Sequence, residues 1–225
     1  PEVVDSIIAI SDADSFAMAH RATKEEGILI GGSGGTAVAA ALRVAEGLTA
    51  DDLVVVLIPD SGRGYLSKVF DKNWMITMGF TDQGGATVAD VISGKPDDKM
   101  KLTYVNPQAT VREAIEVMKA HNLSHIPVAK GEMPLAVAEV IGSVSEDSLR
   151  EKSLEAHGIL ERAIEELMDQ PLPIIGVGEA LDVVAHKMEK SPVALVLVAG
   201  KPHTLLTRVE VLQSISADPR EVRAK

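Results

Sequence analysis

The sequence GGSGGT at residues 31–36 decides how the N-terminal part of this chain is expected to fold. An apolar run at residues 27–30 precedes it and predicts a strand, and an alanine-rich run at residues 37–46 follows it and predicts a helix. Such a turn between strand and helix is a common ligand site in α/β proteins, because free backbone N–H groups point outward there. Glycine lets a flat or anionic group approach the backbone closely. Ser33 can form a directed hydrogen bond to such a group, or it can simply cap the helix.

A second segment of the same kind follows. The continuous apolar run LVVVLI at residues 53–58 predicts a strand that is buried on both faces, as in a parallel sheet. PDSGRG at residues 59–64 follows at the carboxyl end of this strand, where open α/β sheets bind ligands. The same residues are also good turn formers, so a plain β-turn is the alternative.

Composition excludes several classes of protein. The net charge is −11 and aromatic residues make up 3% of the 225 residues, which argues against a nucleic-acid partner. The chain has no cysteine, and its six histidines show no metal-ligand spacing, so we expect no metal site. No apolar run approaches the length of a membrane span, so we expect no membrane partner. The absence of cysteine fits a reducing compartment, so we expect a cytoplasmic location.

The second half of the chain contains an internal repeat, displaced by 70 residues. In each copy a helix carries apolar residues at positions i, i+3, i+4 and i+7, and two strands and a further helix follow it. Each copy is preceded by a short amphipathic helix, at residues 88–92 and 160–168. Two such β-α-β-β-α units are expected to pack face to face. The helical stripes are Val111, Ala114, Ile115 and Met118 in the first copy and Leu181, Val184, Ala185 and Met188 in the second.

This half resembles a tandem pair of CBS domains, a regulatory (Bateman) module that binds adenosyl ligands in clefts between its copies. The second copy ends LLTRVE at residues 205–210, where the family has a strand, Ser or Thr, two variable residues and Asp. The resemblance implies that Thr207 and Glu210, the latter in place of Asp, hold a ribose. The first copy has Ser145 and Ser148 at these places, which makes its cleft the poorer candidate.

The adenine side of the same cleft is expected on the first copy. The resemblance assigns it to the segment that leads into the strand before Pro127, whereas the alternative is a strand entering the core with a half-buried histidine. The segment consists of Leu123, Ser124, His125 and Ile126.

The first half is similar to the C-terminal part of the catalytic domain of the cystathionine β-synthase family, which are pyridoxal-phosphate enzymes of fold type II. The resemblance implies that Ser33 binds the pyridine nitrogen of pyridoxal 5′-phosphate, with Gly31 and Gly32 beside it. Asp60, Ser61 and Arg63 would shape the floor of this site or orient Ser33. The match is carried by residues 31–33, 36, 58–63, 65–67 and 73–75.

The resemblance also implies a reaction, the β-replacement that condenses L-serine and L-homocysteine to L-cystathionine. S-adenosylmethionine would regulate it at the CBS pair, and the protein would be a homo-oligomer, dimeric or tetrameric. The family's Schiff-base lysine lies upstream of the matched residues, so we expect no catalytic residue in this chain and no turnover by it alone. The alternatives are a cysteine synthase that uses O-acetylserine and sulfide, and a non-catalytic sensor of adenosyl ligands.

Together these patterns predict an α/β chain in two parts. Residues 1–80 would be the C-terminal part of the catalytic domain, a parallel sheet with helices, and residues 81–87 a linker. Residues 88–225 would form the CBS-domain pair, with copy one at about 88–153 and copy two at about 159–217.

Overall fold

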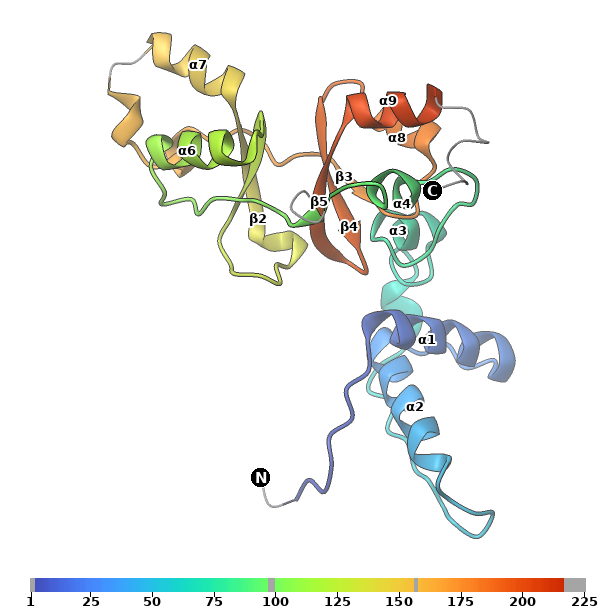
Figure 1. The fold of residues 1–225 in the computed structure, drawn as a ribbon. Coiled ribbons are helices and arrows are strands. Elements are labelled where there is room, and N and C mark those ends of the chain that lie inside the picture. Colours follow the sequence, from blue (N-terminus) through green and yellow to red (C-terminus); the bar gives the residue numbers. More distant parts are fainter. Residues whose placement is uncertain (1–2, 97–99, 156–157, 217–225) are drawn as a thin grey trace. The chain divides into compact units, whose positions relative to one another are not determined.

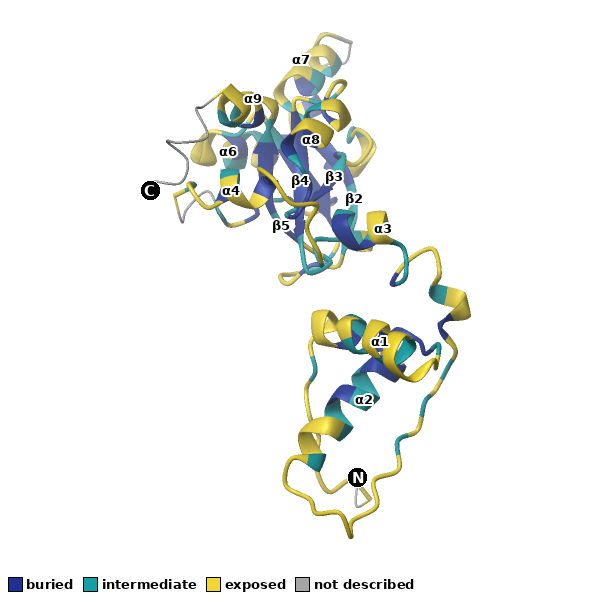
Figure 2. Cartoon of the chain, turned by 90° about the vertical axis from the view of Figure 1, so that its right-hand side faces the viewer, coloured by how far each residue is buried: buried dark blue, intermediate teal, exposed yellow. Residues whose placement is uncertain are grey.

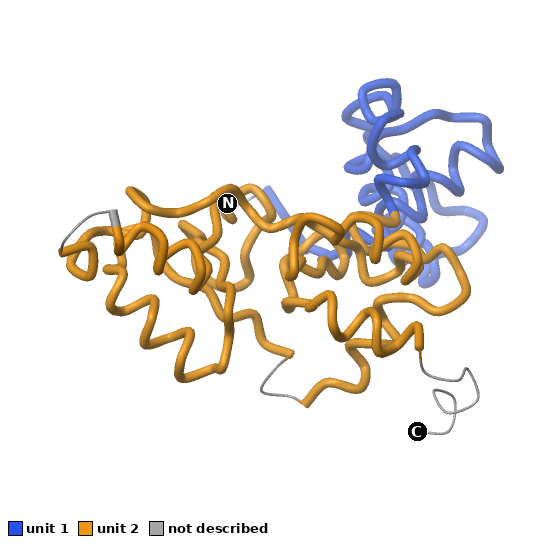
Figure 3. The backbone as a smooth tube through the Cα atoms, turned by 90° about the horizontal axis from the view of Figure 1, so that it is seen from above, with its two compact units in different colours: residues 1–75 blue, residues 76–225 orange. Residues whose placement is uncertain are grey.

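The computed structural model describes residues 3–96, 100–155 and 158–216. It divides the chain into two compact units, Pro1–Met75 and Ile76–Lys225, which are coloured separately in Figure 3. The chain mixes helices and strands, so the predicted α/β class is confirmed. The sequence pattern predicts that the first part extends to residue 80, whereas residues 76–80 belong to the second unit of the structure.

Unit 1 is built on two helices, α1 (Asp12–Glu26) and α2 (Gly32–Ala45). Ser11 caps α1, because its side chain accepts a hydrogen bond from the backbone N–H of Asp14, and Gly27 ends it in the left-handed conformation. The short helices η1 (Gly62–Tyr65) and α3 (Lys72–Thr77) follow later in the chain.

Helix α2 begins earlier than predicted. Its N-cap is Gly31, so the expected glycine turn at residues 32–35 is the first turn of the helix. Close packing explains the glycines, since a Cβ at Gly35 would overlap the carbonyl oxygen of Ser15 on α1. A Cβ at Gly32 would lie 2.9 Å from the ring of Phe16. The two helices can therefore touch through their backbones.

The predicted buried strand at residues 53–58 is wrong for this structure. The segment pairs with no strand in the described part of unit 1, where the one β-bridge joins Ile30 and Ser61. Leu53, Val55 and Leu57 are 83–88% exposed, and Figure 2 shows the segment mostly in yellow. The physical reason is that a strand buried on both faces needs neighbours along both edges, and the described residues of unit 1 supply none.

Unit 2 contains the predicted repeat, and its two copies lie side by side in Figure 1. In each copy a first strand runs parallel to the second, and the second and third are antiparallel. The first strand of copy one is reduced to a single parallel bridge between Val105 and Val128. Copy one comprises α4 (Val88–Ile92), α6 (Val111–His121), β1 (His125–Ala129), η2 (Val137–Glu139), β2 (Val140–Ser145) and α7 (Glu146–Glu155).

Copy two has the same arrangement of strands and helices, but it begins with two short helices instead of one and has a complete first strand, β3 (Ile174–Gly176). Its central strand, β4 (Val193–Val198), lies between β3 and β5 (Lys201–Thr207), is fully apolar and is buried from residue 193 to residue 197. Copy two comprises η3 (Ile159–Glu161), η4 (Ile164–Glu166), β3, α8 (Leu181–Lys187), β4, β5 and α9 (Arg208–Ser216).

The two copies exchange their leading helices. Val88 and Ile92 of α4 pack in the core of copy two, together with Val184 and Val211. Reciprocally, Ile159 and Ile164 of η3 and η4 pack in the core of copy one. The β-bridges Thr87–Ala180 and Thr110–Ala163 repeat the same symmetry. Neither copy completes its core alone, because a third apolar cluster lies between the two sheets. It contains Leu102, Ala129, Leu135, Leu172, Val193, Leu195, Leu197 and Leu205.

The segment at residues 76–83, which includes part of the predicted linker, is hydrogen-bonded to copy two. The backbone N–H of Gly200 donates to Met78 O at 2.7 Å, and that of Gln83 donates to Gly178 O at 2.9 Å. A Cβ at Gly176 would overlap the carbonyl oxygen of Ile76. Glycine at residue 176 therefore lets this segment lie directly against β3.

Gly176→Ala should destabilise the chain by about 1–3 kcal/mol, because the new methyl group meets backbone atoms that cannot rotate away. Gly94→Ala is the matched control, since a Cβ there would make only an ordinary contact of 3.7 Å with Val91 O. Urea unfolding of the two variants measures the difference. Equal free energies of unfolding for both variants would show that the close approach at β3 is not formed.

Candidate functional site

Unit 1 contains a cavity of about 370 Å³ at the N-terminus of α2. Phe16, Tyr65 and Trp74 line it with aromatic rings, Ser33 contributes a hydroxyl group and Lys68 a positive charge. The rings of Phe16 and Trp74 meet edge to face, with centroids 6.1 Å apart. This arrangement suits a flat aromatic ligand that offers a polar atom to Ser33.

Ser33 lies in the first turn of α2 and its side chain is exposed. It does not cap the helix, whose N-cap is Gly31. Its hydroxyl group donates to Oδ1 of Asp60 at 3.4 Å. The other carboxylate oxygen, Oδ2, accepts a hydrogen bond of 2.6 Å from the hydroxyl group of Tyr65. The structure therefore joins Ser33, Asp60 and Tyr65 in one chain of hydrogen bonds beside the cavity.

The other residues predicted near Ser33 have different surroundings. Gly31 and Gly32 are buried at the start of α2. Ser61 caps η1, because its hydroxyl oxygen accepts a hydrogen bond of 3.4 Å from the backbone N–H of Arg63. Ser61 and Arg63 are exposed and lie at the start of the short helix η1.

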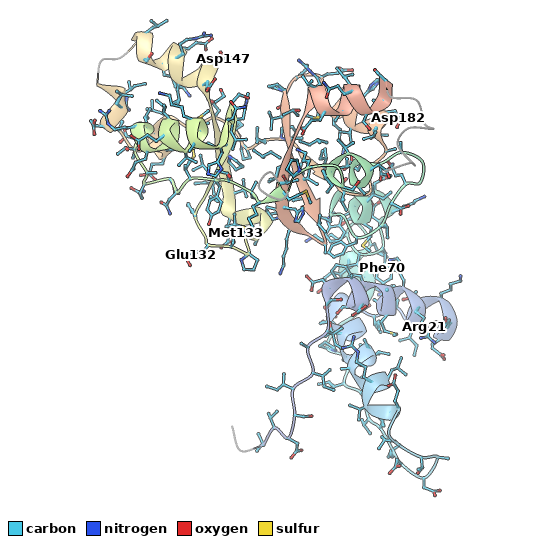
Figure 4. The ribbon with its side chains drawn as sticks, viewed as in Figure 1. Arg21, Phe70, Glu132, Met133, Asp147 and Asp182 are labelled. Atoms are coloured by element: carbon cyan, nitrogen blue, oxygen red, sulfur yellow. The ribbon has the colours of Figure 1, made fainter. Side chains whose placement is uncertain are left out.

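A neighbouring aromatic contact supports α1 in unit 1. The rings of His20 and Phe70 lie 4.9 Å apart, and a ring nitrogen of His20 is 2.7 Å from Val69 O. Phe70 is labelled in Figure 4. These contacts hold the segment after η1, which includes Val69 and Lys68, against the helix that lines the cavity.

In unit 2, Thr207 and Glu210 form a capping box at the start of α9. Oε2 of Glu210 accepts hydrogen bonds of 2.7 Å from both the backbone N–H and the hydroxyl group of Thr207. Oε1 of Glu210 pairs with Nζ of Lys95 at 2.8 Å, and the same Nζ donates to Leu205 O at 2.7 Å. Both carboxylate oxygens of Glu210, which is expected to hold a ribose, therefore already accept hydrogen bonds within the protein.

These contacts decide the charge of Glu210. Burial raises the pKa of its carboxyl group, but the hydrogen bonds from Lys95 and Thr207 together outweigh burial and hold the pKa below its usual value of 4.5. Glu210 is therefore an anion at neutral pH. The sequence analysis found Glu210 and missed Lys95, which is 115 positions away and carries no motif.

The segment expected to line the adenine side leads into β1. Ile126 is fully buried in the core of copy one, and Leu123 packs against that core. Ser124 is exposed, and its hydroxyl oxygen lies 3.0 Å from Nδ1 of the half-buried His125. Leu123, Ser124, His125 and Ile126 therefore lie on copy one, whereas Thr207 and Glu210 lie on copy two.

His125 lies among acidic groups at the start of α7. Burial lowers the pKa of its imidazole below the usual 6.5, although the charges of Asp147, Glu146 and Asp169 oppose this. Asp147 is labelled in Figure 4. Asp169 is itself paired with Nζ of Lys152 at 2.7 Å. Ser145 and Ser148 of copy one correspond to Thr207 and Glu210 of copy two. The hydroxyl oxygen of Ser145 accepts a hydrogen bond of 3.1 Å from the backbone N–H of Ser148.

Two segments of the chain match known families. Residues 1–60 match the family described as pyridoxal-phosphate dependent enzymes, and residues 88–155 match the CBS domain. The N-terminal part of the chain is thus similar to a segment of pyridoxal-phosphate dependent enzymes, and the part that follows is similar to a CBS domain. The predicted resemblance is confirmed in both halves.

The two relatives that match most of the chain are named cystathionine β-synthase. The protein of Dictyostelium discoideum is 25% identical over 224 residues, which cover 94% of this chain and 44% of that protein. That of Oryctolagus cuniculus is 26% identical over 200 residues, or 87% of this chain and 35% of that protein. A probable cysteine synthase of Bacillus subtilis (strain 168) is 46% identical over 66 residues, or 29% and 21%. The chain thus spans less than half the length of these relatives.

Solved structures show the fold of the CBS module. A CBS-domain protein from Burkholderia ambifaria has a TM-score of 0.52 at 23% identity, covering 60% of this chain and 96% of that one. A CBS-domain containing protein from Agrobacterium tumefaciens has a TM-score of 0.50 at 16% identity, covering 58% and 99%. Within the described residues, no helix is long and apolar enough to cross a membrane, and no group of three potential metal ligands occurs.

The stability of the chain should fall as the pH drops below about 6.5. An unfolded His125 takes up a proton near pH 6.5, whereas the folded imidazole, with its lowered pKa, stays neutral, so protons favour unfolding in this range. His125→Gln should remove this part of the pH dependence, and His121→Gln, at the exposed end of α6, is the control. Urea unfolding at pH 7.5 and pH 5.5 measures it. The same loss of stability in His125→Gln as in the unmodified chain would contradict the assignment.

Proposed function

We propose that this chain works as part of a cystathionine β-synthase, which condenses L-serine with L-homocysteine to L-cystathionine and releases water. The observation that carries the proposal is the order of the two matched segments, with Ser33 beside an aromatic-lined cavity in the first of them. The relatives named cystathionine β-synthase support it, because two of them match this chain over 87–94% of its length.

The residues of the cavity fit pyridoxal 5′-phosphate. Gly32 and Ser33 in the first turn of α2 line the cavity, so the hydroxyl group of Ser33 is available at its wall. Phe16 and Trp74 offer apolar surface to a flat ring. When bound, the coenzyme supplies an electron sink for eliminating and replacing a β-substituent. Ser33 would bind the ring nitrogen through a neutral group, and Asp60 would orient Ser33. Since the single hydroxyl proton of Ser33 goes to Asp60, its oxygen would accept the hydrogen bond from a protonated ring nitrogen.

We propose that unit 2 binds S-adenosylmethionine and regulates the reaction. Thr207 and Glu210 would hold the ribose, and the segment from Leu123 to Ile126 would line the adenine. The anionic state of Glu210 supports this role, since Oε1 keeps a lone pair for one ribose hydroxyl group beside its contact with Lys95. A second ribose hydroxyl group would replace the hydroxyl group of Thr207 on Oε2. Regulation requires that the ligand bind the active arrangement more tightly than the inactive one. We also propose a homo-oligomer in the cytoplasm.

A cysteine synthase that uses O-acetylserine and sulfide is the second candidate. It is favoured by the relative from Bacillus subtilis, which is 46% identical over 66 residues. The two reactions differ only in the leaving group and the nucleophile, so the same residues of this chain would serve both.

The test of the reaction is a product assay on the complete protein that carries this chain. Serine plus homocysteine should give cystathionine faster than O-acetylserine plus sulfide give cysteine. Ser33→Ala should lower the rate by about 10–100-fold, the cost of leaving one buried polar atom without its hydrogen-bond partner. Gly64→Ala, in η1 with open space around its Cα, is the control. A faster reaction with O-acetylserine would favour the second candidate, and an unchanged rate in Ser33→Ala would contradict the assigned pocket.

The test of the ligand cleft is calorimetry of this chain with S-adenosylmethionine, AMP and ATP. S-adenosylmethionine should bind most tightly, and Thr207→Ala or Glu210→Ala should weaken it by at least about tenfold, since each removes a hydrogen bond to the ribose. Thr110→Ala and Glu113→Ala are matched controls, because these residues form the same capping box at the start of α6. Unchanged affinity in the Thr207 and Glu210 variants would show that the cleft lies elsewhere.

A further inference from the structure

We propose that Tyr65 is a positioning residue that acts through Asp60 to hold the hydroxyl group of Ser33 at the coenzyme ring. The inference rests on the proposed function and adds a residue to its site. Tyr65 lies in η1 at the edge of the cavity that Ser33 also lines. Residues 65–67 belong to the family match, but the sequence pattern assigns no role to this tyrosine.

The first step is the contact between Tyr65 and Asp60. The phenol donates to Oδ2 of Asp60 at 2.6 Å, a short distance typical of a hydrogen bond to a charged acceptor. The hydrogen bond to Asp60 raises the pKa of the Tyr65 hydroxyl group above its usual value of 10, so the phenol keeps its proton at neutral pH. Tyr65 is therefore a permanent donor, and it fixes the rotation of the carboxylate.

The second step is the direction of the other carboxylate oxygen. With Oδ2 held by Tyr65, Oδ1 of Asp60 faces Oγ of Ser33 at 3.4 Å. The Ser33 side chain is exposed in the first turn of α2 and can rotate about its Cα–Cβ bond. A fixed acceptor at this distance restricts the positions that the hydroxyl group occupies. Ser33 is thereby kept on the side of α2 that lines the cavity.

The third step is the backbone that carries Asp60. The N–H of Gly31 donates to Asp60 O at 3.4 Å, and the N–H of Gly62 donates to Leu29 O at 3.1 Å. A Cβ at Gly31 would overlap Oδ1 of Asp60 and lie 2.9 Å from Cε2 of Tyr65. The carboxylate and the phenol ring therefore both pack on the bare backbone at the N-cap of α2, which makes the contact a built feature of the site.

The test uses the complete holoenzyme that carries this chain, with the variants Tyr65→Phe, Asp60→Asn and Ser33→Ala. Two measurements do not depend on turnover: the dissociation constant of pyridoxal phosphate, from titration of the apoenzyme, and the absorbance spectrum of the bound coenzyme. Tyr65→Phe should weaken coenzyme binding roughly tenfold, in the range found for residues that orient a ligand-binding group. It should also move the absorbance band in the same direction as Ser33→Ala does.

A double-mutant cycle separates positioning from general packing. If Tyr65 acts through Asp60, adding Tyr65→Phe to Asp60→Asn should change the coenzyme affinity no further. Tyr104→Phe is the matched control, because Tyr104 is the other tyrosine of the chain and lies in unit 2. Phenylalanine keeps the ring that packs on Gly31, so folding should be retained, which thermal unfolding checks.

The outcomes separate this inference from the proposed function. If Ser33→Ala changes coenzyme affinity and spectrum but Tyr65→Phe changes neither, the role of Tyr65 is refuted and the pocket stands. Additive effects of Tyr65→Phe and Asp60→Asn would refute the route through Asp60. If Ser33→Ala also leaves both measurements unchanged, the assignment of the pocket itself fails.

Discussion

The site in unit 1 depends on a close approach that only glycine permits. Asp60 and Tyr65 occupy the space that a side chain at residue 31 would fill. Because Gly31 is the N-cap of α2, the same bare backbone starts the helix and brings a carboxylate to its N-terminus, where negative charge is favourable. Ser33, two positions further on, then meets that carboxylate. The absence of a side chain at Gly31 thus allows Asp60 and Tyr65 to pack beside Ser33, where the three form hydrogen bonds next to the cavity.

Unit 2 is governed by a different constraint, the exchange of leading helices between the two copies. Neither sheet can bury its outer face without the helix that precedes the other copy. The exchange also reaches the expected ligand cleft. Lys95, which lies just after α4, pairs with Glu210 at the start of α9. The carboxylate that is expected to hold a ribose is therefore tied to the segment that completes the core of its own copy.

Much of this could be predicted from the sequence. The apolar stripes of α6 and α8 depend only on neighbours within a few residues, so they predict the repeat correctly. The strand at residues 53–58 was predicted wrongly, since burial on both faces depends on partner strands that the local pattern does not contain. Contacts between residues far apart in the sequence cannot be predicted from local patterns for the same reason. Lys95 finds Glu210, and Tyr65 finds Asp60 beside Ser33, only once the chain is folded.

The central claim is that the hydroxyl group of Ser33 binds the ring of the coenzyme. A crystal structure of the complete protein with pyridoxal phosphate bound measures this directly, as the distance from Oγ of Ser33 to the pyridine nitrogen. We predict a hydrogen-bond distance of roughly 2.6–3.2 Å, with Asp60 still beside Ser33. A coenzyme bound elsewhere, with Ser33 facing only protein or solvent, would contradict the claim.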